Sequence, residues 1–114
     1  MSECLFCKLV SGAIPSDKVY EDGDFLAFRD ISPQAPTHVL LIPKRHIPAL
    51  TELRRDDADL AGALMLTAAK LSSQLGLDSG GYRWVVNCGE NGCQSVPHVH
   101  LHILGGRMLG WPPG

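Results

Sequence analysis

Three histidines alternate with aliphatic residues over residues 98–104, and this segment is the strongest chemical signal in the chain. Side chains of a β-strand point alternately to opposite faces, so the pattern predicts His98, His100 and His102 on one face. The aliphatic residues between them would then face a hydrophobic core. A row of titratable groups about 6.5–7 Å apart contributes little to folding. The segment therefore favours a catalytic or binding role.

The spacing of the row limits what each imidazole can do. The outer two histidines would lie roughly 13 Å apart at the backbone, so the three are expected to have different roles. His100 is central and suits a nucleophile, because an imidazole with a pKa of about 6.5 is largely unprotonated near neutral pH. Ser95 precedes the row, and Asn87 ends the strand predicted before it. Their hydroxyl and amide groups can hold a phosphate or assist a leaving group.

A second signal is the Cys-x-x-Cys motif of Cys4 and Cys7. The two thiols share one face of a predicted helix, and the βαβ context of a thioredoxin-like redox site is absent. Zinc sites commonly combine such a pair with two further nitrogen or sulfur ligands. The residues leave open two ordinary buried thiols, or a zinc site completed by either of two pairs: Cys88 and Cys93, or His46 and His98.

The elements that must position these groups are two helices and five short strands. Residues 4–11 form a predicted short helix that Gly12 can end, and residues 56–75 form the predicted main helix with Gly76 at its cap. The predicted strands, of which the first two form a hairpin, are 18–21, 25–30, 37–42, 82–87 and 98–104. The expected fold class is α+β, with one long helix on one face of the sheet. Because a single helix cannot cover both faces, we also expect a dimer.

Length and composition restrict the class of protein. A chain of 114 residues, 45% hydrophobic and 19% charged, is expected to form one domain over residues 1–114 without disulfides. Its net charge of −2 offers no basic surface for nucleic acid. No apolar run approaches the roughly 18–20 residues of a membrane span, and the N-terminal segment lacks the apolar core of a signal peptide. We therefore expect a cytoplasmic protein whose cysteines are reduced or bound to metal.

The pattern His-φ-His-φ-His-φ-φ, in which φ is apolar, resembles the signature of the histidine triad (HIT) superfamily. Residues 28–38, Phe-Arg-Asp-Ile-Ser-Pro-Gln-Ala-Pro-Thr-His, resemble that family's nucleotide-binding segment. Residues 94–96, 105–107 and the ending 111–114, Trp-Pro-Pro-Gly, are similar to the Hint branch, the histidine triad nucleotide-binding proteins. The resemblance covers essentially the whole chain. It implies a five-stranded antiparallel HIT fold that forms a homodimer with a ten-stranded sheet.

The resemblance also implies an activity, the hydrolysis of purine nucleoside phosphoramidates such as adenosine 5′-phosphoramidate to AMP and an amine. By position in the motif, His100 resembles the nucleophile that becomes nucleotidylated at Nε2. His102 resembles the contact to the α-phosphate, and His38 the buried histidine that supports the nucleophile. Ser95 resembles a phosphate and leaving-group contact. Water would then hydrolyse the nucleotidyl-histidine, with no metal needed at the phosphorus.

Further nucleotide contacts are implied in the same way. Asp30 resembles the carboxylate that binds the ribose hydroxyls, and Asn87 a contact to phosphate or leaving group. Apolar residues correspond to the base pocket: Phe6, Leu9, Ile14 and Ile31. Val96, directly after Ser95, corresponds to one more nucleotide contact. The C-terminal segment around Trp111 is expected, by the same resemblance, to lie near the partner subunit's site.

The resemblance also selects between the two zinc ligand sets. Bacterial members of the superfamily with Cys-x-x-Cys bind zinc through a histidine after the central strand and the first histidine of the triad. That implies a structural zinc held by Cys4, Cys7, His46 and His98, and it releases His98 from the reaction.

Three other functions compete with phosphoramidate hydrolysis. The first is a dinucleoside polyphosphate hydrolase of a neighbouring branch, against which the Hint-like ending argues. The second is a nucleotide-binding or scaffold protein without a catalytic role. The third, which the sequence supports least, is a hydrolase with a catalytic zinc on two histidines of the row.

Overall fold

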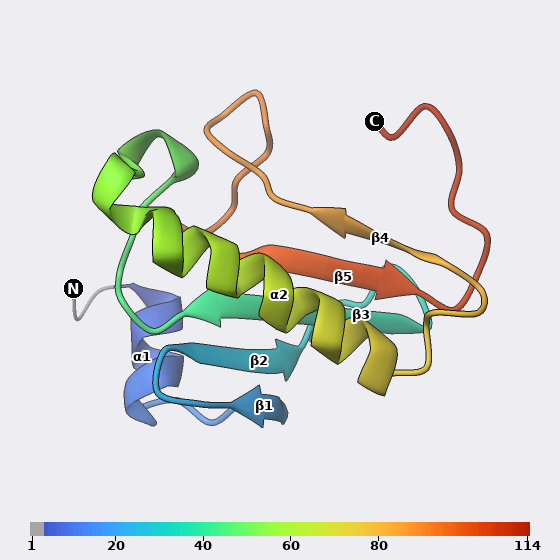
Figure 1. Ribbon diagram of the computed structural model, residues 1–114, viewed down its shortest axis with the longest axis horizontal. Helices are drawn as coiled ribbons and strands as arrows, with labels where there is room; N and C mark the ends of the chain where they lie inside the picture. The colour runs from blue at the N-terminus through green and yellow to red at the C-terminus, as the bar shows by residue number, and fades with distance from the viewer. Residues whose placement is uncertain (1–3) are drawn as a thin grey trace.

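A five-stranded antiparallel sheet of order β1-β2-β3-β5-β4 forms the centre of the computed structural model, which describes residues 4–114. The strands are β1 (Lys18–Glu21), β2 (Phe25–Arg29), β3 (Thr37–Pro43), β4 (Tyr82–Val85) and β5 (Leu101–Gly105). The long helix α2 (Ala58–Gln74) crosses one face of the sheet, and the short helix α1 (Leu5–Ser11) packs on the other (Figure 1). The predicted fold class is confirmed. No helix of the described chain is long and apolar enough to cross a membrane.

The two layers of core follow from alternation along the central strands. Both faces of β2 and β3 are covered, which explains their nearly continuous apolar sequence. Val39 and Leu41 point towards α2 and pack with Leu71. Leu40 and Ile42 point the other way and join the cluster beneath α1. One face therefore holds the main core, and the other is available to the N-terminal helix and the histidines.

The ends of α2 follow the sequence signals with one difference. Gly76 has a φ of +78° and forms the predicted cap, in which the Leu77 N–H donates to the Ser72 carbonyl at 3.0 Å. At the other end, α2 begins two residues later than predicted. Residues Arg55–Asp57 form a 3-10 turn instead, in which the Asp57 carboxylate accepts the Arg54 N–H at 2.8 Å.

The strand predicted over 98–104 is shorter in the structure, because β5 begins only at Leu101. Continuing the register of β3 and β5 would place Pro43 opposite Val99. Proline has no N–H for the ladder, and the Val99 N–H donates instead to the Ile47 carbonyl at 2.7 Å. The first two histidines of the row therefore lie on irregular backbone just before the strand.

The predicted separation of faces nevertheless holds along this segment. Leu101 and Ile103 lie in the core cluster beneath α2. On the opposite face, the ring of Phe6 from α1 packs edge-on against the imidazoles of His98 and His100.

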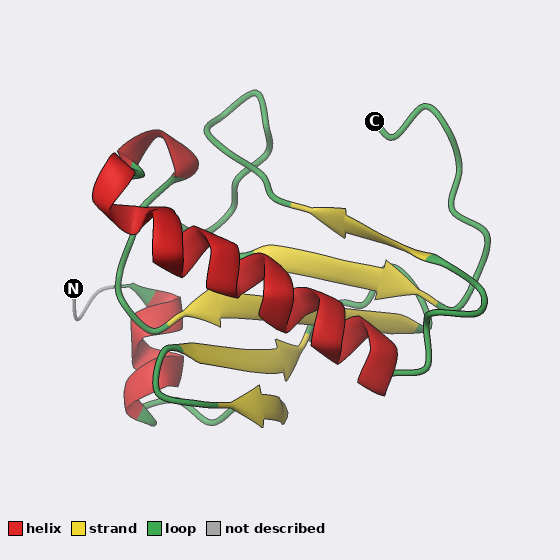
Figure 2. Cartoon of the chain, viewed as in Figure 1, coloured by secondary structure: helices red, strands yellow, loops and turns green. Residues whose placement is uncertain are grey.

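The loop between β4 and β5 is longer than predicted, because β4 ends at Val85, two residues earlier than expected. Residues 86–100 run as a loop towards the start of β5 (Figure 2). The side chain of Gln94 holds this loop in place. Its Nε2 donates to the Pro48 carbonyl at 2.7 Å, and its Oε1 accepts the Gly89 N–H at 3.0 Å. The loop is thereby fixed to the segment that follows β3.

Candidate functional site

Two thiols and two imidazoles converge where α1 meets the segments before β5 and after β3. The donor atoms of Cys4, Cys7, His46 and His98 all lie within 4.8 Å of one another. The two Nδ1 atoms are 3.2 Å apart. His98 Nδ1 lies 3.5 Å from Cys4 Sγ and 3.7 Å from Cys7 Sγ, and Cys7 Sγ lies 3.2 Å from His46 Nδ1. The structure thus brings together the ligand set that the resemblance selects, and Cys88 and Cys93 are not part of this cluster.

The donor set fits a zinc ion. Tetrahedral zinc, with Zn–N near 2.0 Å and Zn–S near 2.3 Å, separates two nitrogens by about 3.3 Å and a sulfur from a nitrogen by about 3.5 Å. The observed separations are close to both values. His98 is also prepared as a ligand, because its Nε2–H donates to the Pro43 carbonyl at 2.8 Å and leaves the Nδ1 lone pair facing the cluster. Burial lowers the pKa of His98, which favours the neutral form that a metal requires.

His100 is almost fully buried, and one backbone contact determines its tautomer. Its Nδ1 lies 2.7 Å from the main-chain carbonyl of His98. A carbonyl can only accept, so Nδ1 must carry the proton. The Nε2 of the neutral ring then has a free lone pair, as a nucleophile requires.

A chain of hydrogen bonds gives His102 the opposite arrangement. The Gln34 N–H donates to His38 Nδ1 at 3.0 Å, so the proton of neutral His38 is on Nε2. That Nε2–H lies 2.9 Å from His102 Nδ1 and 3.5 Å from an Asp30 carboxylate oxygen. His102 Nδ1 therefore accepts, and the proton of neutral His102 lies on Nε2. His100 offers an acceptor at Nε2, whereas His102 offers a donor there.

His38 and His102, the two histidines of this hydrogen-bond chain, stay neutral near pH 7. Burial, followed by the neighbouring His100 and His38, lowers the pKa of His102 from 6.5 to about 4. Burial also lowers the pKa of His38, and the nearby carboxylate of Asp30 only partly opposes this. Asp30, His38 and His102 also have donor atoms within 4.8 Å of one another. We interpret this group as a hydrogen-bond chain, because both ring nitrogens of His38 are already engaged.

The residues expected to bind the nucleotide are only partly assembled around the histidines. Phe6 and Leu9 are buried in the cluster beneath α1, where Ile14 and Val96 pack at its margin. Ile31, by contrast, is 99% exposed, so it contributes nothing to that apolar cluster. Asp30 is half-buried, and its Oδ1 accepts the Ser32 N–H at 2.8 Å, which fixes the carboxylate next to His38.

The two polar residues of the β4–β5 loop differ in how they are held. The amide nitrogen of Asn87 donates to the Gly92 carbonyl at 2.7 Å, so this side chain already helps to shape the loop. Ser95 is exposed, just before the histidine segment. Its hydroxyl is free to turn towards a ligand.

Sequence reasoning missed the groups that set the tautomers. These are the carbonyls of Pro43 and His98 and the N–H of Gln34. Main-chain groups are present at every position, so residue types carry no signal for them. Residue type alone also gives no sign that the side chain of Gln94 joins two loops.

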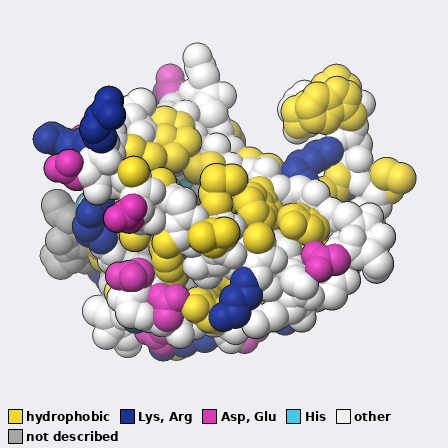
Figure 3. Space-filling model, in the orientation of Figure 1, with side chains coloured by type: hydrophobic (Ala, Val, Ile, Leu, Met, Phe, Trp, Pro, Cys, Tyr) yellow, Lys and Arg dark blue, Asp and Glu magenta, His cyan; other side chains and the backbone are white. Residues whose placement is uncertain are grey.

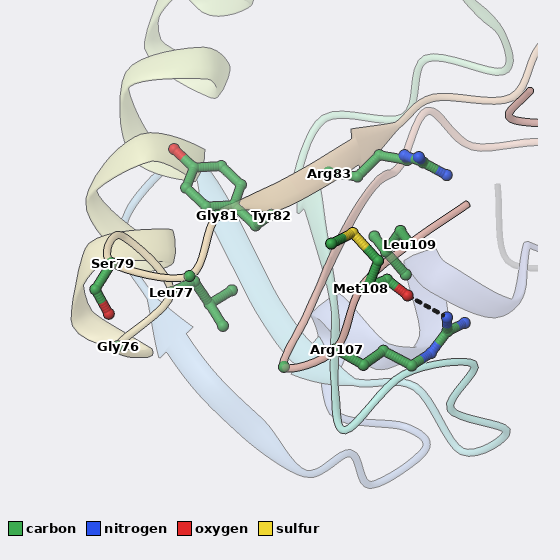
Figure 4. Close-up of a pocket in the computed structure, with 11 residues that line it drawn as sticks. Gly76, Leu77, Ser79, Gly81, Tyr82, Arg83, Arg107, Met108 and Leu109 are labelled. Atoms are coloured by element: carbon green, nitrogen blue, oxygen red, sulfur yellow. Dashed lines mark hydrogen bonds between the residues drawn. The ribbon is translucent and has the colours of Figure 1, made fainter. Parts of the chain in front are cut away.

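A surface cavity of about 570 Å³ lies away from the histidines, between the segment after α2 and the C-terminal segment. Arg83 and Arg107 are among its lining residues, and Figure 4 shows Arg107 bonded to the Met108 carbonyl in its wall. Arg83 donates to the Gly110 carbonyl at 2.6 Å. Both guanidinium groups are thus engaged in holding the C-terminal segment, and no histidine or cysteine lines this cavity.

Comparison with known proteins places this geometry in a family. A HIT domain model matches residues 11–109. The chain is 48% identical to a 14 kDa zinc-binding protein of Brassica juncea, over 98% of this chain and all of that protein. It also superposes on a HIT family hydrolase of Legionella pneumophila with a TM-score of 0.97, at 51% identity over 98% of this chain and all of the other.

A more distant structure is similar too. A histidine triad nucleotide-binding protein of Candida albicans aligns with a TM-score of 0.82 and 35% identity, over 96% of this chain and 83% of that one. The fold is that of HIT family hydrolases. On these matches and on its own histidine pattern, the chain belongs to the HIT family.

Proposed function

We propose that this protein hydrolyses purine nucleoside phosphoramidates to the nucleoside monophosphate and an amine, through a nucleotidyl-histidine. The observation that carries the proposal is the 2.7 Å contact between His100 Nδ1 and the His98 carbonyl. This contact leaves Nε2 unprotonated and able to attack. The similarity to a HIT family hydrolase and to a histidine triad nucleotide-binding protein supports hydrolysis and nucleotide binding.

The proposed reaction has two steps. In the first, the lone pair of His100 Nε2 attacks phosphorus and the P–N bond breaks. The amine leaves with a proton that comes from solvent water, and the exposed Ser95 hydroxyl can relay it. The Nε2–H of His102 donates to a phosphate oxygen and stabilises charge that develops there. In the second step, water attacks the phosphorus, the bond between His100 Nε2 and phosphorus breaks, and His100 leaves as the neutral imidazole while a proton of the water passes to solvent.

We further propose that Cys4, Cys7, His46 and His98 hold one zinc ion. Two thiolates and two imidazoles form a donor set that zinc prefers, and a similar protein is named for zinc binding. A metal bound there would cross-link three segments that are distant in sequence, around residues 4–7, 46 and 98. A cytoplasmic location fits this proposal, because a reducing compartment keeps the thiols available.

We also propose a homodimer that joins two sheets through β4 into ten strands. β4 is an edge strand with unpaired backbone groups. The other edge, β1, carries charged pairs around Glu21 that discourage such pairing. Hydrophobic side chains gather over α2 (Figure 3), where Met65 is 58% and Leu66 is 75% exposed. We expect Trp111, 81% exposed in the C-terminal segment, to lie near the partner subunit's site in such a dimer.

Removing the nucleophile tests the activity. We expect His100→Ala to lower kcat for an adenosine phosphoramidate by about a thousandfold or more, because no other group can form the covalent bond. Mass spectrometry after an acid-free quench should find a nucleotidyl adduct on His100 of the wild type. Faster turnover of a diadenosine polyphosphate would instead favour the neighbouring branch. AMP binding without turnover of either substrate would indicate a binding protein.

Metal analysis tests the zinc proposal. We expect one zinc ion per chain in the purified protein and a loss of bound metal in Cys7→Ser. Cys93→Ser is the matched control, because Cys93 is exposed and outside the cluster. A folded wild type that binds no zinc, or a Cys93→Ser variant that loses it, would contradict the assignment.

The dimer is tested by charging the face of α2. We expect Leu66→Asp to shift the protein from dimer to monomer in light scattering coupled to gel filtration. Leu5→Asp is the control, because Leu5 is also exposed but lies on α1 at the opposite face of the sheet. Unchanged mass for Leu66→Asp, or a monomeric wild type, would show that α2 is not the interface.

The low pKa of His102 predicts a pH-dependent stability. Between pH 6.5 and about 4, His102 is protonated in the unfolded chain and neutral in the folded chain. The free energy of unfolding should therefore fall as the pH drops through this window. Urea unfolding of metal-loaded wild type and His102→Asn should show a shallower slope in the variant, since both share the metal site. Equal slopes would mean that His102 titrates normally.

A further inference from the structure

We infer that His98 is a positioning residue for the nucleophile, so that metal bound at the cysteine–histidine cluster controls the tautomer and orientation of His100. The inference rests on the proposed role of His100 as nucleophile. It assigns the metal site a part in the rate of reaction in addition to its part in stability.

The first link runs through the single residue His98, which is fully buried. Its ring contributes Nδ1 to the cluster, and its Nε2–H donates to the Pro43 carbonyl. Its main-chain oxygen accepts the proton of His100 Nδ1 at 2.7 Å. A metal ligand and the group that sets the tautomer of the nucleophile therefore belong to one residue.

The second link holds the other side of the same peptide unit. The carbonyl of His98 and the N–H of Val99 lie in one rigid plane. That N–H donates at 2.7 Å to the carbonyl of Ile47, which directly follows the cluster residue His46. The peptide plane whose oxygen contacts His100 is thus fixed by His98 itself and by the residue that follows His46. Since β5 begins only at Leu101, no sheet ladder fixes this plane instead.

The third link is α1. This helix has seven residues and no side-chain hydrogen bond at its N-cap, so it has little stability of its own. Cys4 and Cys7 anchor its first turn to the cluster. Phe6, between them, packs edge-on against His98 and His100, with ring centroids 5.9 and 5.1 Å away. Anchoring the helix therefore also restrains the ring of the nucleophile.

Without a metal, little holds the cluster together. His98 Nδ1 carries no proton, so the one hydrogen bond open to the two imidazoles is a bond that His46 Nδ1 donates across 3.2 Å. The remaining protons belong to thiols, which are weak hydrogen-bond donors. One such bond and weak thiol donors hold these side chains less firmly than four bonds to a metal, so the peptide plane between His98 and Val99 is expected to move in the metal-free protein. His100 then loses the carbonyl that keeps its proton on Nδ1.

Two substitutions of His46 distinguish the effect of losing the metal from the effect of losing the imidazole. Both remove the imidazole, and only one is expected to keep the metal. We expect His46→Ala to lose the metal and to lower kcat by about tenfold to hundredfold with little change in KM, because the nucleophile is misdirected. His46→Cys restores a fourth ligand and should bind metal and keep kcat within about twofold of the wild type. Cys93→Ser should behave as the wild type.

Nitrogen-15 spectra of the imidazoles supply a readout independent of activity. In metal-loaded wild type and His46→Cys, His100 should be protonated at Nδ1 alone. In His46→Ala, with the sheet still folded by circular dichroism, it should be a mixture of both tautomers. A single Nδ1–H tautomer together with unchanged kcat in metal-free, folded protein would overturn the inference.

If His46→Ala does not fold, Cys7→Ser offers a weakened site whose occupancy zinc can titrate. The tautomer and kcat should then follow occupancy, and constant values across the titration would also overturn the inference. Failure of the proposed function looks different. Metal-loaded wild type would then cleave no phosphoramidate, while the His100 tautomer would still respond to metal.

Discussion

The arrangement of the site depends on the hydrogen-bond contacts of one buried side chain, the imidazole of His98. A buried polar group is costly unless its hydrogen-bonding atoms are satisfied. For His98, this requires Pro43 at the end of β3 on one ring nitrogen and the thiols of α1 near the other. The N-terminal helix, the end of the central strand and the segment before β5 must therefore meet at one point. His100, the proposed nucleophile, lies two residues beyond that point.

The antiparallel register then completes the site from the sheet itself. Leu40 lies opposite His102, which places His38 and His102 diagonally on the face that α2 does not cover. Because side chains alternate, the apolar partners Leu101 and Ile103 belong to the other layer. Polar chemistry and hydrophobic packing thus occupy opposite sides of the same strand. Burial at this position is the largest cause of the lowered pKa of His102.

Much of this could be predicted from the sequence, and the rest depends on contacts that residue types do not specify. The histidine alternation predicts which side chains share a face, and Gly76 predicts the end of α2. The late start of β5 was missed because it depends on Pro43, which only the strand register brings opposite Val99. The exposure of Ile31 could not be predicted, because the motif that suggests a base contact says nothing about packing.

Backbone groups of opposite polarity explain how identical side chains come to do different chemistry. A carbonyl at His100 Nδ1 makes the far nitrogen of that ring an acceptor. An amide N–H at His38 Nδ1, passed on through one hydrogen bond, makes the far nitrogen of His102 a donor. The proposed attack on phosphorus needs the first arrangement, and the proposed contact to a phosphate oxygen needs the second. A uniform row of imidazoles is therefore differentiated by its fixed backbone neighbours.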